Sequence, residues 1–179
     1  MGISYLFRFR YLSIFLILFI TVGCGKFSRL SWKECFEQGK KIHYDTSISS
    51  QKRFAEAEEA YRAALKKLEK ALGKESVKTK DMRELFNEAE NVLRNQAKYA
   101  ELEPILKKKI DLYGKYLGEN KVLTGAAHEG LGHLYKKLKR NKEAAFEYRL
   151  AMNVYKIKKR ESAVEKMKNL IQTLNITED

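Results

Sequence analysis

The chain has 179 residues, a formal net charge of +13 and two cysteines. So few cysteines exclude a disulfide framework as the main support of the fold. The length suits one ordinary domain behind a targeting segment. The basic surplus restricts strongly charged partners to anionic lipid, acidic protein or nucleic acid.

The N-terminus has the features of a targeting segment. Arg8 and Arg10 form a basic region, and residues 12–22 are almost wholly apolar. A membrane-spanning helix needs about 20 apolar residues, so this shorter run favours a cleaved signal over a permanent span. Residues 21–24, Thr-Val-Gly-Cys, follow the run and resemble a bacterial lipobox, with Thr21 in place of the usual Leu.

The lipobox resemblance implies a lipoprotein in which residues 1–23 are the signal peptide, Cys24 is the lipidation site with palmitate-type chains, and residues 24–31 are a lipidated tether. Two or more acyl chains hold a protein stably at one membrane leaflet. Gly25 stands where an Asp would signal retention at the inner membrane, so we expect a cell-envelope protein, at the periplasmic face of the outer membrane in a Gram-negative organism. The alternative is an ordinary secretory signal, which leaves Cys24 able to form a disulfide with Cys35.

The chain after the tether is predicted to be helical. Trp32, Cys35, Phe36 and Gly39 share one helical face, with Cys35 as a small buried residue. Residues 44–52 have no helical period and are expected to form a long loop. Residues 54–73 then form an amphipathic helix that Gly73 ends, and its apolar stripe is Ala57, Tyr61, Ala64, Leu65, Leu68 and Leu72.

This helix recurs along the chain. Residues 99–118 match residues 54–73 at an offset of 45, and a third copy begins at Asn141, a further 42 residues on. The helices before the copies also match at an offset of 42, through the pairs Phe86 and His128, Ala89 and Leu131, and Leu93 and Tyr135. Lys109 stands where a small residue is expected, which predicts looser packing in the middle copy.

The residues around the third copy resemble the signature of the tetratricopeptide repeat (TPR) family. They are His128, Leu131, Gly132, Tyr135, Ala144, Tyr148 and Ala151. At the first helix Trp32, Cys35, Phe36 and Gly39 have the same spacing, with the Phe and the Gly in exchanged roles. The long second helices, the sequence YAELEP at 99–104 and residues 122–124 are similar to kinesin-light-chain-type repeats.

This resemblance implies an all-α fold, a right-handed α-solenoid of about three TPR-like helix pairs over residues 32–175, with a C-terminal capping helix within residues 162–174. Residues 176–179 are expected to be a frayed tail. Pro104 fits only if its helix begins at about residues 99–101, because a proline ring clashes with the carbonyl four residues back.

The sequence contains no recognisable arrangement of catalytic or metal-binding residues. His128 and His133 superficially resemble an HExxH zinc motif, but they are five residues apart and so roughly 140° around a helix. We expect His128 in the core and His133 on an exposed face. Residues 130–132 form a lone GxG inside a predicted helix, without the preceding strand that a phosphate-binding loop needs. We therefore predict no enzyme activity, no metal site and no cofactor.

A polar groove is the predicted binding site. In TPR proteins the first helix of each pair faces a groove that holds a peptide or helix, so the resemblance implies a partner protein. Here the groove positions of two consecutive first helices are Asn87, Asn91, Arg94, Asn95, Glu129, His133, Lys136 and Lys137.

The resulting hypothesis is a membrane-anchored TPR scaffold or adaptor that binds a partner protein in a bacterial envelope assembly. The alternative is a basic helical protein that binds anionic lipid or cell-wall polymer surfaces. Loss of residues 1–23 removes two arginines and no acid, so the remaining chain keeps a net charge of 34 − 23 = +11. Nucleic acid is the least favoured partner, because an exported protein rarely meets it.

Overall fold

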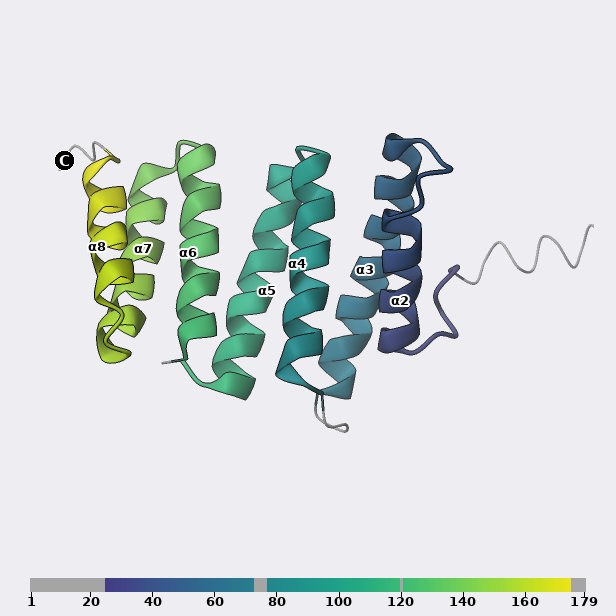
Figure 1. The fold of residues 1–179 in the computed structure, drawn as a ribbon, viewed down its shortest axis with the longest axis horizontal. Helices are drawn as coiled ribbons and strands as arrows, with labels where there is room; N and C mark the ends of the chain where they lie inside the picture. Colours follow the sequence, from purple (N-terminus) through teal and green to yellow (C-terminus); the bar gives the residue numbers. More distant parts are fainter. Residues whose placement is uncertain (1–24, 73–76, 120, 175–179) are drawn as a thin grey trace, which may run out of the picture.

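The computed structural model describes residues 25–72, 77–119 and 121–174. Within these ranges the chain is all-α and contains no strand, as predicted. The helices, shown in Figure 1, are α2 (Trp32–His43), α3 (Ser50–Ala71), α4 (Thr79–Asn95), α5 (Tyr99–Leu117), α6 (Val122–Lys137), α7 (Asn141–Ile157) and α8 (Glu161–Gln172). The predicted signal peptide, Cys24, Gly73 and the predicted frayed tail lie outside the described residues.

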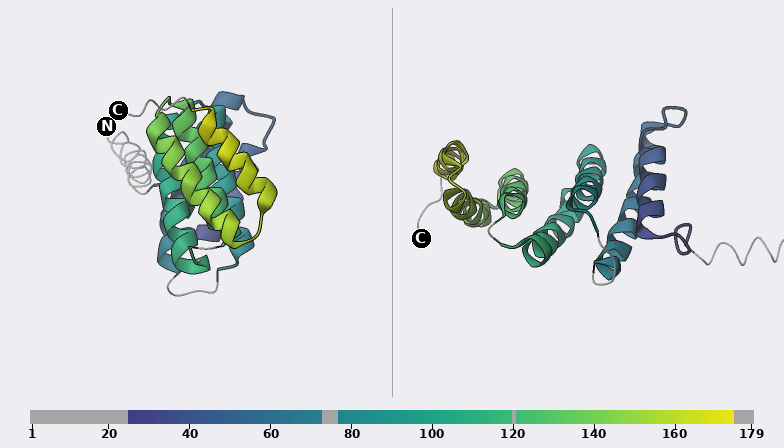
Figure 2. Two further views of the ribbon diagram at one scale, coloured as in Figure 1. Left: turned by 90° about the vertical axis from the view of Figure 1, so that its left-hand side faces the viewer. Right: turned by 60° about the horizontal axis from the view of Figure 1, so that its bottom comes forward.

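The helices form a row in chain order. Each one packs mainly against the helix before it and the helix after it. Figure 2 shows two layers, with α2, α4, α6 and α8 in one and α3, α5 and α7 in the other. We call α2–α3, α4–α5 and α6–α7 the first, middle and third pairs. The α2–α4, α4–α6 and α6–α8 joints are the places where neighbouring helices of the first layer face each other.

One hydrophobic core extends along the row. Phe86, Tyr61, Tyr113 and Tyr148 are among its largest fully buried side chains. The predicted stripe of α3 is confirmed, because all of its members are buried except the half-buried Leu72. Full burial of a large apolar side chain contributes about 1.5–3 kcal/mol. Apolar contact between neighbouring helices is therefore the main force that holds the row together.

Glycines set the close approach of the helices in the first and third pairs. A Cβ at Gly39 would lie 2.5 Å from the Tyr61 ring, and a Cβ at Gly132 would lie 2.6 Å from the Tyr148 ring. Gly39 is therefore the structural counterpart of Gly132. The sequence comparison had placed Phe36 at this position, and that alignment of α2 is wrong by about one helical turn. The tyrosine ring selects the glycine, because it leaves no room for a side chain there.

The middle pair has an ion pair at this place. Glu90 is the counterpart of Gly132, and Lys109 is the counterpart of Ala151, both at the offset of 42. Their charged groups lie 2.7 Å apart, and each side chain is 12% exposed. Two long side chains need more room than a glycine and an alanine, and α4 and α5 pack more loosely than the helices of the other two pairs. The looser packing predicted from Lys109 is confirmed.

Three turns share one backbone conformation. Their central residues, Ala97, Lys139 and Lys159, have φ of 54°, 59° and 52°. In each turn the next N–H donates to a carbonyl five residues back, through the pairs Lys98 to Leu93, Arg140 to Tyr135, and Arg160 to Tyr155. This is the Schellman arrangement that closes a helix end. It connects α4 to α5, α6 to α7 and α7 to α8 in the same way.

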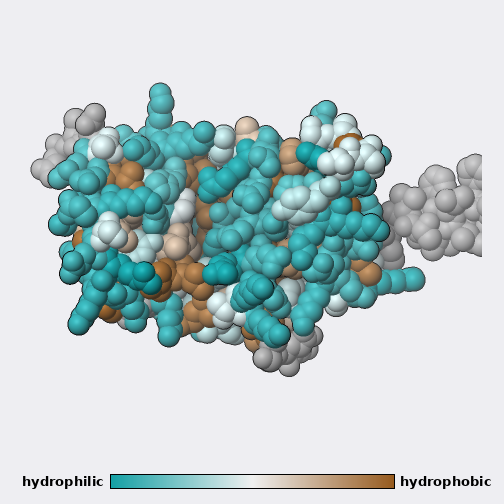
Figure 3. All heavy atoms as spheres, viewed as in Figure 1, coloured by the Kyte–Doolittle hydropathy of each residue, from teal (hydrophilic) through white to brown (hydrophobic). Residues whose placement is uncertain are grey.

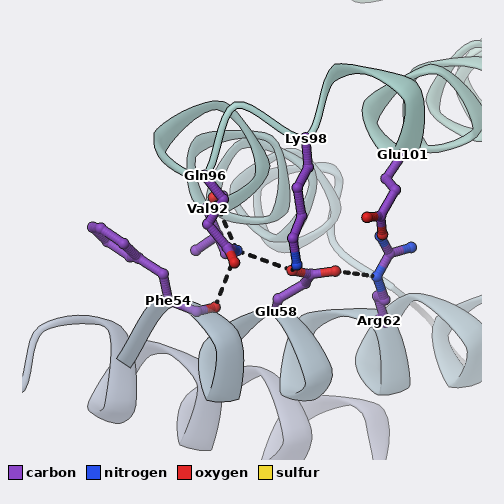
Figure 4. Close-up of polar contacts among 7 residues, drawn as sticks. All are labelled: Phe54, Glu58, Arg62, Val92, Gln96, Lys98 and Glu101. Atoms are coloured by element: carbon purple, nitrogen blue, oxygen red, sulfur yellow. Dashed lines mark hydrogen bonds and ion pairs between the residues drawn. The ribbon is translucent and has the colours of Figure 1, made fainter. Parts of the chain in front are cut away.

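A buried carboxylate links the first pair to the middle pair (Figure 4). Glu58 on α3 is 8% exposed. It accepts hydrogen bonds from Lys98 at 2.6 Å, Gln96 at 2.9 Å and Arg62 at 2.8 Å. Burial opposes ionisation of Glu58, but these bonds outweigh it and hold its pKa below the ordinary value.

The middle pair is linked to the third pair by the same device. Glu103 on α5 is the counterpart of Glu58 at the offset of 45. It accepts from Arg140 at 2.5 Å and from the Tyr135 hydroxyl at 3.0 Å, and it pairs with Lys107 at 2.7 Å. A repeated ionic contact therefore joins successive pairs, in addition to the continuous core.

Two helix starts were tested by the structure. α3 begins at Ser50, so the loop predicted over residues 44–52 is too long and ends at Ser49. Asp45 accepts a hydrogen bond from the Ser47 N–H at 2.8 Å and so forms a compact turn before the helix. α5 begins at Tyr99, as Pro104 requires, and ends at Leu117, and the next residue, Gly118, has a φ of 97° that favours glycine.

Candidate functional site

The α2–α4 joint is closed by polar side chains. Lys40 of α2 pairs with Glu84 of α4 at 3.2 Å. The His43 ring nitrogen Nδ1 lies 3.0 Å from the Glu88 carboxylate, and the Tyr44 hydroxyl donates to Glu88 at 2.9 Å. Lys40 and His43 of α2, and Tyr44 directly after it, thus contact two carboxylates of α4 that stand four residues apart.

The α6–α8 joint is also closed. Glu129 of α6 accepts from Lys166 of α8 at 2.6 Å and from the Tyr155 hydroxyl at 2.7 Å. Hydrogen bonds lower the pKa of Glu129 to about 2, the largest contribution coming from His133, despite its partial burial. Lys136 of α6 donates to Thr173 at 3.0 Å.

The α4–α6 joint differs from both, and we call it the seam. No hydrogen bond or ion pair joins α4 to α6 among the residues that the structure describes. The α6 positions that match Glu84 and Glu88 at the offset of 42 are Ala126 and Gly130. With Leu123, they form an uncharged α6 wall, and Figure 3 shows hydrophobic surface between the hydrophilic surfaces of the helices in this region.

The α4 wall of the seam is polar and carries half of the predicted groove residues. Asn91 and Asn95 are exposed. The Arg94 guanidinium is 37% exposed, and its ion pair with Glu90 within the same helix is long, at 3.6 Å. Asn87 is exposed and accepts from Lys109 at 3.2 Å. Asn91 and Arg94 therefore make no polar contact with α6 in the described chain, and Asn95 lines a hollow with Ser50, Gln51 and Phe54 at the start of α3.

Packing does not require the glycine in the α6 wall. A Cβ at Gly130 would meet Leu106 at 3.6 Å, which is an ordinary contact, whereas a Cβ at Gly125 would lie 3.0 Å from Val154. A glycine inside a helix costs about 1 kcal/mol relative to alanine. Gly130 therefore has this cost without a packing reason.

The seam borders a hollow where α4 and α6 begin. The hollow has a volume of about 720 Å³. It is lined by Thr79, Tyr116, Leu117, Lys121, Val122, Leu123 and Lys158. Under the α4 wall, the buried Tyr113 hydroxyl has no hydrogen-bond partner, whereas its counterpart Tyr155 donates to Glu129.

The other predicted groove residues do not all lie at the seam. Glu129 and Lys136 make the α6–α8 contacts given above. The exposed His133 ring packs edge-on against Tyr148, with centroids 5.4 Å apart, and its Nδ1 lies 2.9 Å from the tyrosine hydroxyl. Lys137 is exposed and lies 4.7 Å from the Tyr99 ring centroid, near the start of α5.

Polarity could not have identified Ala126 and Gly130, because neither residue carries a functional group. The usable signal is their offset of 42 from the paired acids Glu84 and Glu88.

His128, expected in the core, is 12% exposed and lies 2.7 Å from Glu147. His133 is exposed, as predicted.

The described fold is an all-α row of helix pairs with one open joint. No group of three or more histidine, cysteine or acidic side chains in the described ranges is arranged to hold a metal ion. None of the described helices is long and apolar enough to cross a membrane. Comparison with protein-family models and with curated protein sequences finds no match for the chain.

Proposed function

We propose that this protein is a membrane-anchored scaffold or adaptor and that its seam binds a partner polypeptide in a bacterial envelope assembly. In this proposal the row is a right-handed α-solenoid of three TPR-like helix pairs, and α8 caps it. The observation that carries the proposal is the open α4–α6 joint between two joints that polar side chains close. A binding site needs contact groups held on rigid elements, and Asn91 and Arg94 on α4 meet this requirement.

The repeated geometry of the pairs supports the solenoid. The Gly39–Tyr61 and Gly132–Tyr148 contacts are alike, and the carboxylates Glu58 and Glu103 link successive pairs in the same way. In a solenoid each repeat contacts its neighbours and the stacked first helices line one extended surface. The seam lies on that surface.

The start of the described chain supports the anchor. Phe27 is 5% exposed, and Lys67 of α3 donates to the carbonyls of Phe27 at 2.6 Å and Ser28 at 3.1 Å. Residues 25–31, predicted as a tether, are therefore packed onto the body. Lipid on Cys24 would hold the adjacent face of α3 at the membrane, where Lys66 and Lys70 line a hollow beside Gly25. Each such lysine contributes about 1 kcal/mol of attraction to anionic lipid.

In-cell crosslinking tests the adaptor role. A photoreactive residue at Asn91 should capture one discrete partner protein, whereas the same residue at Lys52, an exposed position on the other layer, should not. The double variant Asn91→Ala, Arg94→Ala should weaken capture from a third position, Lys137, while helicity is retained. Equal capture from Asn91 and Lys52, or no capture at all, would remove the adaptor assignment.

Labelling with radioactive palmitate tests the anchor separately. We expect incorporation in the natural chain and none in Cys24→Ser, with the Cys24→Ser protein released from membranes. Membrane release without a change in label would contradict lipidation at Cys24 and leave the adaptor proposal to the crosslinking result.

A further inference from the structure

We infer that the seam binds an acidic helical segment whose carboxylates occupy the places that Glu84 and Glu88 occupy in the α2–α4 joint. This inference rests on the proposed adaptor function and specifies the chemistry of the partner. It follows from a template that the molecule itself contains.

The template is the correspondence between α2 and α4. Gly39 and Glu90 hold the same position in their pairs, because both are counterparts of Gly132. The next residues therefore correspond as well, through the pairs Lys40 and Asn91, His43 and Arg94, and Tyr44 and Asn95. The α2 members of these pairs are the three donors that bind the α4 carboxylates. The α4 members are likewise hydrogen-bond donors.

The acceptors are missing from the next helix. If α6 repeated α4, carboxylates would stand at residues 126 and 130, where the chain has Ala126 and Gly130. Neither residue can accept a side-chain hydrogen bond, so α6 offers Asn91 and Arg94 no counterpart of the acceptors that Lys40 and His43 have on α4. Asn95 instead lines a hollow beside the start of α3. A carboxylate from another polypeptide can enter over the small residues Ala126 and Gly130.

Charge and geometry favour this occupant over others. The guanidinium of an arginine such as Arg94 can bind a carboxylate in a fixed, bidentate geometry, and the chain without residues 1–23 has a formal charge of 34 − 23 = +11. A basic segment would be repelled, and a purely apolar one would leave the α4 donors buried without acceptors, at a cost of about 1–3 kcal/mol for each group. Residues four apart on a helix lie on one face, so a helix with two such acids reproduces the spacing of Glu84 and Glu88.

A substitution that supplies the missing acceptors within the chain tests the inference. Ala126 is exposed, and a Cβ at Gly130 would make only an ordinary contact, so the double variant Ala126→Glu, Gly130→Glu should fold. Its new carboxylates should bind the α4 donors and occupy the seam. We expect it to be at least as thermally stable as the natural protein and to lose affinity for an acidic peptide. The matched control is Ala126→Gln, Gly130→Gln, which has the same side-chain size without the charge.

The measurement uses the chain that begins at Gly25, which keeps the whole described core from Phe27 to Leu174. Its affinity is measured by fluorescence anisotropy for an alanine-rich helical peptide with two Glu residues four apart, and for the same peptide with two Lys residues. We expect the Glu peptide to bind about tenfold more tightly, with less preference at high salt. The Glu double variant should lose this preference, and the Gln control should keep a larger part of it.

Three outcomes of the peptide measurements would contradict the inference. Equal binding of the two peptides, binding of neither, or full binding by the Glu double variant would overturn it. The adaptor proposal would survive these results if crosslinking from Asn91 still captured a partner, whose contact segment would then not be acidic. Capture of a partner through an acidic helix would support both.

Discussion

The ammonium group of Lys98 lies 2.6 Å from the buried carboxylate of Glu58 and so connects the turn after α4 to the middle of α3. Arg140 holds the same relationship to Glu103, one repeat further along the chain, at 2.5 Å. The seam depends on this frame, because the α4 and α6 walls can stay apart only if something else fixes the pairs relative to one another.

Removal of the first of these carboxylates should destabilise the row. Glu58→Ala deletes the acceptor for Lys98, Arg62 and Gln96, and a hydrogen bond to a charged group makes a net contribution of about 1.5–3 kcal/mol. Because the donors are partly exposed and can bind water, we expect a loss of about 2 kcal/mol in the free energy of unfolding, measured with urea. Glu165→Ala, at a carboxylate 59% exposed in its pair with Lys168, should change stability by less than about 0.5 kcal/mol. Equal effects of the two substitutions would remove the proposed role of Glu58.

Stability should fall in acid because of Glu103 and Glu129. Both pKa values are lowered from 4.5 to about 2, mainly by Lys107 for Glu103 and by His133 for Glu129. A pKa that is lower in the folded state means that the stabilisation is fully present above about pH 4.5 and is lost as the pH falls toward 2. The double variant Glu103→Gln, Glu129→Gln should lose less stability between these pH values than the natural protein does, in urea unfolding at a series of pH values. An unchanged pH dependence would show that other groups carry it.

Substitution by alanine should have opposite effects on stability at two glycines of α6. Gly132→Ala would force a methyl group into the Tyr148 ring, 2.6 Å away, and overpacking of this kind costs about 1–3 kcal/mol. Gly130→Ala meets only an ordinary contact and should stabilise the helix by about 0.5–1 kcal/mol. Thermal unfolding of the two variants measures the difference. Destabilisation by Gly130→Ala would mean that this glycine has a packing role after all.

Substitution of alanine by glycine should stabilise the protein at Ala97 and destabilise it at Ala55. Ala97 has φ of 54°, a conformation that glycine adopts without strain, so Ala97→Gly should raise the free energy of unfolding by about 1 kcal/mol. Ala55 is exposed within α3, and the same change there should lower it by about 1 kcal/mol. Chemical denaturation of both variants gives the two signs, and a loss of stability at Ala97 would contradict the assigned turn.

Local periodicity was enough to predict most helices. The stripe from Ala57 to Leu68 predicted the buried face of α3, and Pro104 predicted where α5 begins, because each depends on residues within one or two turns. The start of α3 at Ser50 was missed, since a polar first turn carries no apolar period. The register of α2 was also missed, because Gly39 is identified only by the ring of Tyr61 that packs on it.

The sequence by itself determined the helical repeats, their offsets and the polar character of the α4 surface, because these are properties of residues close together in the chain. Only the tertiary structure decided that Glu90 pairs with Lys109, that Glu129 belongs to the α6–α8 joint, and that α6 offers Asn91 and Arg94 no acceptor at Ala126 and Gly130. The physical reason is that a polar group becomes a binding site or a structural contact according to what stands opposite it. The opposite side chain comes from another helix, whose distance and rotation are fixed by packing.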